Sequence, residues 1–468
     1  MTTSHPESMI AGDGAAIASL RSSFRGELLT ADTPGYDRAR SVWNGNIDRR
    51  PALVARCTGV ADVRAAVRFC GDLGLPVSVR GGGHSAPGYG TNDAGVVIDL
   101  SPMKGIHVDP ISRSVRAEGG VLWRELDRET QQFGLAVTGG TVSSTGIAGL
   151  TLGGGLGWLM GRYGLTVDNL LSADVVTSEG AFHSVSAEQE PELFWALRGG
   201  GGNFGVVTSF EYRLHPVTEV LGGMIAHPLG QAGAVARFYR EFCDGLPDEA
   251  EAYLGFFTDP QAGVPIVALF LGYNGDLAEG ERVLAPARSF GRPIVDLVAP
   301  MPYTARQAIL DEPNARQGLH RYWRSTFLPE LSDGLLDVLV DRASDLSSPL
   351  SAMLLFYFHG AAARIPPGQT AFASRRLQWD LDVVGQWTDP LSSDHQVAWV
   401  RDVWSRIELD AASPTYINHI SEDDRPETIR ASYGSNHDRL RQLKAIYDPN
   451  NLFRLNPNIV PAPTAAAR

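Results

Sequence analysis

The sequence is poor in cysteine, in positive charge and in long apolar runs. Its three cysteines, Cys57, Cys70 and Cys243, have no zinc-ligand spacing and are too few for a disulfide framework. We interpret them as small buried hydrophobic residues. Asp and Glu outnumber Lys and Arg by 53 to 40, and a net charge of −13 argues against nucleic acid as a partner.

Other signals are missing as well. No stretch approaches the roughly 18 consecutive apolar residues of a membrane-spanning helix, and residues 1–33 are too polar for a secretory signal peptide. We therefore expect a cytoplasmic protein without a membrane partner, as a monomer or a homodimer. The histidines form no H-x-H or H-x-x-x-H pair, so we expect no metal site. A Gly-x-Ser-x-Gly motif is absent, which leaves a serine hydrolase unsupported.

Glycine is the residue in excess, with 51 among 468 residues against a usual share of roughly 7%. The run RGGGHS at residues 80–85 follows a short alternating strand. Its glycines allow the backbone to approach a ligand and to point successive N–H groups at an anion, an arrangement called a nest. His84 would then lie within reach of whatever binds there. A glycine turn followed by an exposed histidine is the alternative.

Two further glycine clusters follow. The cluster at 139–157 is interleaved with Leu150, Leu152, Leu156 and Trp158, which favour burial, so we interpret it as a ligand-contacting segment and not as a linker. The cluster at 199–205 contains a formal GxGxxG. A dinucleotide fingerprint needs a strand before it and a helix after it. Here a predicted helix precedes and a predicted strand follows, so we reject a Rossmann site.

The character of the chain changes after residue 216, where glycine becomes rarer and aromatic residues more frequent. Alternating apolar and aromatic runs predict strands at 253–257, 266–273 and 353–360. Helical spacing predicts helices at 335–347 and 394–407. These elements indicate a second domain of the α+β class.

Four ordered motifs carry a family resemblance. They are RGGGHSAPGYGTNDAGVVIDLS at 80–101, the glycine-rich segment at 138–170, ELFWALRGGGGNFGVVTSFEYRLHP at 192–216 and YDPNNLFRLNPNIVP at 447–461. The chain resembles the berberine-bridge-enzyme-like FAD-linked oxidases, of the vanillyl-alcohol-oxidase superfamily with its PCMH-type FAD-binding domain. The resemblance implies an α+β fold in two parts. Residues 1–216 and 411–468 would form the FAD-binding domain, and residues 217–410 an inserted substrate-binding domain on an antiparallel sheet flanked by helices.

The resemblance also implies how FAD is held. The ring of His84 would be bonded covalently to the flavin 8α-methyl group. Many members add a second link through a cysteine, but Val142 stands at that position here, so we expect a single link. The pyrophosphate would lie on the 79–85 nest and near Ser144, Gly146 and Gly149. The full set of implied FAD contacts besides His84 is Val79, Arg80, Gly81, Gly82, Gly83, Ser85, Tyr89, Thr141, Ser144, Gly146, Gly149, Gly153, Gly154, Gly155, Gly205, Val207, Asn418, Asn456 and Asn458.

Two segments contain candidate catalytic residues. On the predicted strand at 354–360, a period of two puts Leu355, Tyr357 and His359 on one face. Relatives often carry Glu or Tyr facing the flavin on the matching strand, so Tyr357 is the first candidate for the base; a tyrosine packed in the core is the alternative.

The segment Tyr416-Ile-Asn418-His419 resembles the family's Y-x-N-Y, in which a tyrosine often acts as base. The last position is histidine here, so proton abstraction would fall to Tyr416 or His419. Alternatively, Asn418 holds the flavin and His419 is structural.

These residues predict an FAD-dependent oxidase. It would remove a hydride from an alcohol, sugar, amine or related small metabolite, by analogy a secondary metabolite, and reduce O2 to H2O2. A flavin-dependent oxygenase or dehydrogenase on the same scaffold is one alternative. A flavin-bearing binding protein without turnover is another.

Overall fold

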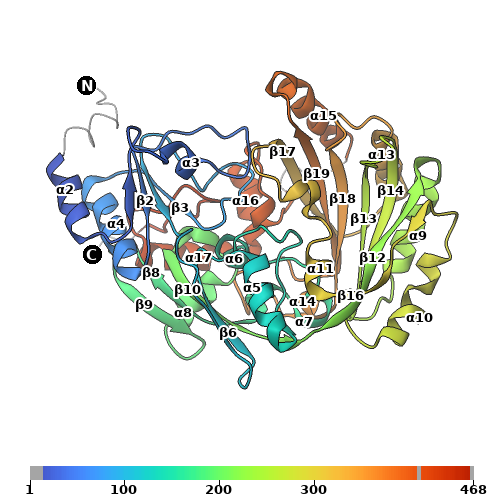
Figure 1. The fold of residues 1–468 in the computed structure, drawn as a ribbon, viewed down its shortest axis with the longest axis horizontal. Coiled ribbons are helices and arrows are strands. Elements are labelled where there is room, and N and C mark those ends of the chain that lie inside the picture. The colour runs from blue at the N-terminus through green and yellow to red at the C-terminus, as the bar shows by residue number, and fades with distance from the viewer. Residues whose placement is uncertain (1–13, 408–412, 464–468) are drawn as a thin grey trace.

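The computed structural model describes residues 14–407 and 413–463, which form two units lying side by side (Figure 1). The first unit, built from the N-terminal half and the C-terminal segment, contains two smaller sheets with helices. The second unit is a single large sheet with helices on its outer face. Helix and strand are both abundant, which confirms the predicted α+β class.

One sheet of the first unit has the strand order β1 (Glu27–Leu29), β2 (Leu53–Arg56), β4 (Val96–Asp99) and β3 (Val77–Arg80). Strands β2, β4 and β3 run parallel. Helix α4 (Val60–Leu73) packs its apolar face against this sheet, and Gly74 ends it in the left-handed region with a φ of 64°. Parallel strands of this kind need a crossover, and α4 supplies it between β2 and β3. The short helices α2 (Gly14–Ser23) and α3 (Tyr36–Arg40) lie at the start of the unit.

The other sheet of the first unit is antiparallel. Its order is β5 (Ile106–Asp109), β6 (Ser114–Glu118), β10 (Val206–Arg213), β8 (Leu170–Val176) and β9 (Phe182–Ser186). The helices of this part are α5 (Trp123–Thr130), α6 (Ile147–Leu152) and α8 (Pro191–Leu197). Helix α8 precedes the 199–205 glycines and β10 follows them, which confirms that the GxGxxG lacks a Rossmann context.

The C-terminal segment returns to this unit. Helices α16 (Pro426–Tyr433) and α17 (His437–Tyr447) bring Tyr433 and Leu440 into the same buried cluster as Phe210 of β10. Ala371, from within the predicted inserted domain, also joins that cluster, so the 217–410 segment contributes to both cores. The predicted boundary between residues 410 and 411 lies outside the described residues.

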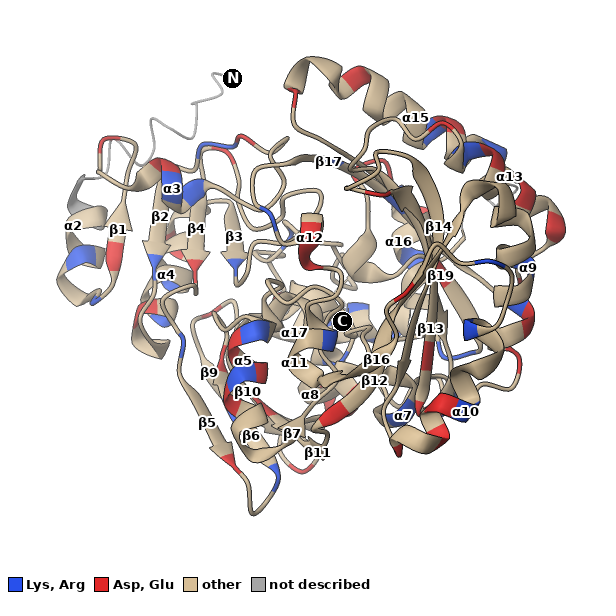
Figure 2. Cartoon of the chain, turned by 45° about the vertical axis from the view of Figure 1, so that its right-hand side comes forward, with Lys and Arg blue, Asp and Glu red and all other residues tan. Residues whose placement is uncertain are grey.

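The second unit is an eight-stranded antiparallel sheet. Its order is β15 (Val295–Asp296), β12 (Glu219–Pro228), β14 (Pro265–Tyr273), β13 (Ala250–Thr258), β18 (Ala352–Phe358), β19 (Gln378–Trp387) and β17 (His320–Leu328), with β16 (Ala299–Pro302) also paired to β12. Helices α9 (Ala232–Cys243), α13 (Asp333–Ala343) and α15 (Ser393–Arg406) cover one face, and α10 (Leu277–Arg288) packs near β12. Figure 2 shows charged residues along α13 and α15, on the outside of the molecule. The opposite face of the sheet packs towards the first unit.

One segment of the second unit reaches across to the first. Residues 303–318, here called the strap, include α11 (Tyr303–Gln307) and α12 (Asp311–Asn314). The Asp311 carboxylate accepts hydrogen bonds from the backbone N–H and the hydroxyl of Ser143, at 2.7 and 2.6 Å. The Trp43 indole N–H donates to the Asn314 carbonyl at 2.7 Å. The strap therefore ties the large sheet to two separate loops of the first unit.

The remaining elements are short. Strand β7 (Leu135–Ala136) pairs with β11 (His215–Pro216), and α7 (Met160–Tyr163) packs against α14 (Gly360–Arg364). Within the described ranges, no helix combines the length and apolar character needed to cross a bilayer. Cys57, Cys70 and Cys243 are buried and unpaired, as interpreted from the sequence.

Candidate active site

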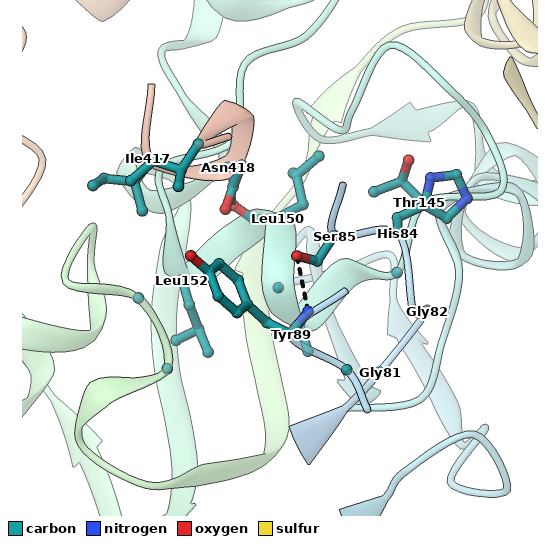
Figure 3. A pocket seen from close by; sticks show the side chains of 18 of the residues that line it. Gly81, Gly82, His84, Ser85, Tyr89, Thr145, Leu150, Leu152, Ile417 and Asn418 are labelled. Carbon is teal, nitrogen blue, oxygen red and sulfur yellow. Dashed lines mark hydrogen bonds between the residues drawn. The ribbon is translucent and has the colours of Figure 1, made fainter. Parts of the chain in front are cut away.

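A deep pocket lies between the two units. The first unit contributes the 79–85 segment at the end of β3 and parts of the 141–156, 201–207 and 453–457 segments. The sheet contributes Trp323, Leu354, Phe356, Asp382 and Val384, and the strap contributes Leu310 and Asn314. Figure 3 shows the first-unit side of this pocket, with Tyr89 pointing towards Ile417 and His84 beside Thr145.

The 79–85 segment forms the wall of the pocket with its backbone. Strand β3 ends at Arg80, whose guanidinium is bound by the buried Asp99 carboxylate at 2.7 Å and donates to the Ser41 carbonyl. Its charge is therefore neutralised inside the protein. Gly83 has a φ of 69°, which favours glycine. A Cβ on Gly82 would lie 2.4 Å from the Gly146 nitrogen, so this segment and the 141–146 loop meet backbone to backbone.

The pocket wall fits a large flat ligand that contacts backbone. Gly149 and Gly202 both line it, and a Cβ on Gly149 would meet no atom within 4 Å. The side-chain oxygen of Asn456 is buried at the wall, and no described residue bonds to it. A buried polar atom without a partner is uncommon and indicates a ligand or water at that point. Backbone nest, open glycines and this orphaned oxygen are the features expected of a dinucleotide cofactor site.

His84 is held from two sides. Its ring stacks on Trp43 with 4.8 Å between ring centroids, and its Nε2 lies 2.9 Å from the Ser144 hydroxyl. Burial lowers the pKa of His84 to about 3. The positive charges of Arg321 and, to a smaller extent, Arg124 act in the same direction. The imidazole is therefore neutral at physiological pH, which is the state that a nucleophilic histidine needs.

Most of the predicted site residues meet at this pocket. Val79, Arg80, Gly81, Gly82, Gly83, His84, Ser85, Tyr89, Thr141, Gly146, Gly149, Gly205, Val207, Tyr416, Asn418, His419 and Asn456 all line it. Val142, the residue at the expected cysteine position, lines it too.

Five predicted contacts are not among the residues that line the pocket, and their contact with FAD stays a prediction: Ser144, Gly153, Gly154, Gly155 and Asn458. Ser144 bonds to His84. Gly153 packs on Asn418 and Gly154 on Phe372, while the Gly155 N–H donates to the Tyr416 hydroxyl. The glycines in this stretch therefore serve close packing behind the wall.

The expected position of Tyr357 is wrong. Its side chain lies on the helix-covered face of the sheet, stacked on His359 at 4.8 Å and beside Trp379. Leu354 and Phe356, on the other face of β18, line the pocket instead. The alternation along the strand is as predicted, but both faces are apolar and buried, so the pattern does not tell which of them meets the pocket. Tyr357 is the core tyrosine of the alternative interpretation.

Tyr416 presents an oxygen that accepts several hydrogen bonds. The donors are the Asn418 amide at 2.7 Å, the Gly155 N–H at 2.8 Å and the Leu156 N–H at 3.3 Å. Burial raises the pKa of Tyr416 to about 12, and the three donors act in the opposite direction. Hydrogen bonds to an anionic oxygen favour the phenolate. The Asn418 amide also donates to the Leu150 carbonyl, which keeps the amide in place.

An acidic pair that the sequence analysis missed lies next to His419. The His419 Nδ1 is 3.0 Å from a carboxylate oxygen of Asp380 and 3.0 Å from one of Asp382. Burial lowers the pKa of His419, but Asp382 and Asp380 outweigh it and raise the pKa to about 10. Burial and the Asp382 charge raise the pKa of Asp380 to about 6. We call these three residues the acid–histidine cluster. Acids at alternate positions of the buried strand β19 were the signal available in the sequence.

Comparisons with known proteins agree with this site. Residues 51–186 match the model of the FAD binding domain, and residues 415–460 match that of berberine and berberine-like proteins. (R)-6-Hydroxynicotine oxidase of Paenarthrobacter nicotinovorans is 33% identical over 454 residues, covering 94% of this chain and 97% of that protein.

Solved structures share the fold. 6-Hydroxy-D-nicotine oxidase from Arthrobacter nicotinovorans has a TM-score of 0.85 at 30% identity, with 94% of this chain and 99% of that chain covered. A chitooligosaccharide oxidase has a TM-score of 0.83 at 24% identity, covering 96% of this chain and 100% of that one. The protein is thus an FAD-linked oxidoreductase of the oxidase type, with the PCMH fold. Within that class, the chain belongs to the berberine-bridge-enzyme-like family.

Proposed function

We propose that this oxidase carries FAD bonded to His84 through a single link, binds a small amine as its ammonium ion, oxidises it once a proton has been removed and passes the electrons to O2 to give H2O2. The observation that carries the proposal is that one pocket joins a neutral, oriented histidine on a glycine-rich segment to two members of the acid–histidine cluster, Asp382 of the facing sheet and His419. Alcohols and sugars are the other substrates that the family resemblance implies.

The cofactor part rests on the first-unit wall. FAD would lie along the 79–85 backbone and the glycine-lined wall, with its ring end at His84. The Nε2 of His84 is hydrogen-bonded to the Ser144 hydroxyl, which leaves Nδ1 as the atom for the bond to the flavin. Val142 offers no sulfur for a second link, and the three cysteines are buried away from the pocket.

Bound FAD supplies the hydride acceptor, and the chain supplies substrate orientation and proton removal. We assign the base to Tyr416. With a pKa of about 10, His419 is already protonated at neutral pH and accepts no further proton. Tyr416 acts as base only as the phenolate, so its own proton passes to solvent first. Three hydrogen-bond donors to its oxygen stabilise that anion, which then takes the proton of the substrate.

The substrate class follows from charge. At neutral pH the two carboxylates and the imidazolium of the acid–histidine cluster carry a net charge of −1. Asp382 lines the pocket, with the Trp323 indole donating to its carboxylate at 3.0 Å and Phe356 nearby on the same sheet face. A carboxylate beside aromatic faces favours an ammonium group over a neutral hydroxyl. The 33% identical relative is named for 6-hydroxynicotine, whose saturated-ring nitrogen is basic.

The cofactor link is tested by denaturing the purified holoenzyme and measuring its intact mass. A mass increase by one FAD, lost in His84→Ala, supports the proposal, and peptide mapping then counts the attachment points. Flavin that washes out of the wild-type protein would contradict it. One H2O2 released per substrate oxidised distinguishes an oxidase from an oxygenase or a dehydrogenase.

The substrate class is tested with amine and alcohol pairs of the same carbon skeleton, such as benzylamine and benzyl alcohol. Each is titrated anaerobically against the flavin absorbance of the holoenzyme. We expect the amine to bind at least about tenfold more tightly and Asp382→Asn to remove that preference. Equal affinity, or a preference that Asp382→Asn leaves intact, would refute the amine assignment without touching the cofactor link.

A further inference from the structure

We propose that Ser144 selects the tautomer of His84 that can form the flavin bond, and that the strap, through Asp311, holds Ser144 in position. Both are positioning residues for cofactor attachment and neither touches the substrate. The inference rests on the proposed histidyl link, and it names the residues of this chain that make that link possible.

The tautomer follows from hydrogen-bond donors and acceptors. A neutral imidazole has one N–H and one nitrogen lone pair. The Ser144 hydroxyl, 2.9 Å from Nε2, is the described hydrogen-bond partner of the ring. A hydroxyl can accept from an N–H or donate to a lone pair, so the contact by itself fits both tautomers. We infer the tautomer with the proton on Nε2, because an N–H there has Ser144 as acceptor, whereas no described residue accepts from Nδ1. Nδ1 then carries the lone pair, which is the nucleophile.

The hydroxyl also suits the product. In the overall reaction a C–H bond of the 8α-methyl group is exchanged for a C–N bond to Nδ1. Two protons leave, one from the methyl group and one from Nε2, and two electrons pass to O2, which becomes H2O2. Afterwards Nε2 has a lone pair and needs a donor. A serine hydroxyl accepts before the reaction and donates after it, which neither an alanine nor a backbone carbonyl can do.

The strap fixes this arrangement on both sides of the ring. Asp311 binds the backbone N–H and hydroxyl of Ser143, the residue before Ser144. Three residues further along, the Asn314 carbonyl accepts from the indole of Trp43, which stacks on His84. One short segment therefore positions both the hydrogen-bond partner and the stacking partner of the histidine.

The environment keeps the ring neutral as well. The buried Arg321 lies over the Trp43 ring, with its guanidinium carbon 3.7 Å from the ring centroid. Its guanidinium also donates a hydrogen bond to the Trp43 carbonyl. A positive charge so close disfavours protonation of His84, in agreement with its lowered pKa. Protonated Nδ1 would be unable to attack, so the charge and the Ser144 hydrogen bond act towards the same end.

The test compares Ser144→Ala, Ser144→Thr and Asp311→Asn with the wild-type holoenzyme. Two quantities are measured: total FAD per chain from the absorbance of the native protein, and the covalent fraction from the intact mass after denaturation. We expect Ser144→Ala to keep FAD bound but to reduce its rate of covalent attachment roughly tenfold, the scale of one lost hydrogen bond. Ser144→Thr, which keeps the hydroxyl, should restore attachment, and Asp311→Asn should slow it to a smaller extent.

Matched controls come from the same chain. Ser178 donates to the Tyr447 carbonyl and joins two segments of the first unit away from the pocket, and Asp259 accepts from two backbone N–H groups in an exposed turn. Ser178→Ala and Asp259→Asn should attach FAD as the wild type does. Wild-type attachment in Ser144→Ala, or loss of all FAD from it, would overturn the inference. If the wild-type protein itself carries no covalent FAD, the proposed link fails first.

Discussion

Replacing Tyr416 by phenylalanine removes one oxygen that serves structure and chemistry at once. The ring keeps its packing, but the Gly155 N–H and the Asn418 amide lose an acceptor at 2.8 and 2.7 Å. A buried donor left without a partner costs ~1–3 kcal/mol. The Leu156 bond is longer, at 3.3 Å, and Asn418 keeps its bond to Leu150. With two strong hydrogen bonds lost, we expect unfolding to become easier by ~2–4 kcal/mol.

The chemical effect should be larger than the structural one. Loss of a positioned general base lowers the rate by roughly 10²–10⁴. The assay is anaerobic stopped-flow mixing with substrate, in which the bleaching of the flavin reports hydride transfer directly. Covalent FAD should be retained in Tyr416→Phe, because the hydrogen bond and the stacking that hold His84 involve Ser144 and Trp43.

A second buried tyrosine separates the two effects. Tyr433 is 1% exposed, donates to the Pro457 carbonyl at 3.1 Å and does not line the pocket. Tyr433→Phe should lower the thermal midpoint and leave the bleaching rate unchanged. If the flavin of Tyr416→Phe is bleached at a rate within about threefold of the wild-type rate, the base is another group. Asp382 then becomes the next residue to replace.

Further predictions follow from the same geometry. Tyr357→Phe should leave the flavin bleaching rate near that of the wild type, because the hydroxyl lies on the helix-covered face; a large loss of rate would contradict the assigned faces. Gly82→Ala should reduce bound FAD per chain, since the new Cβ would meet the Gly146 nitrogen at 2.4 Å, and full FAD content would refute this. As pH falls through about 6, Asp380 is protonated and the net charge of the acid–histidine cluster changes from −1 to 0. The dissociation constant of an amine should therefore rise below that pH, while that of the matched alcohol stays constant.

The glycine motifs made the cofactor side of the pocket predictable from the sequence. Three glycines before His84 have few structural uses other than a backbone nest, and all three line the pocket. The hydrogen bond between Ser144 and His84 is not predictable from the sequence, because a position in the chain does not indicate the direction of a hydroxyl group. The strap was not predicted, since the hydrogen bonds between Asp311 and Ser143 join residues 168 positions apart.

The substrate side was less predictable. Strand β18 is apolar on both faces, so Leu355 and Tyr357 were as plausible at the pocket as Leu354 and Phe356. Strand β19 gives the stronger indication of a functional site. Burying two carboxylates is energetically costly unless a cation lies beside them. His419 is that cation, and it arrives from a segment about forty residues further on, so the sequence alone does not pair it with Asp380.

The pairing of β18 with β19 has a consequence for how this scaffold acquires new specificities. Leu354 lies opposite Asp382, and Phe356 opposite Asp380. Leu354, Phe356 and Asp382 line the pocket, so they form a small grid on two adjacent strands. The cofactor wall belongs to other parts of the chain. We therefore expect that exchanging residues on the grid alters the preferred substrate and leaves the bound flavin unchanged. A combinatorial library confined to these positions should yield variants that differ in preferred substrate but share one flavin spectrum.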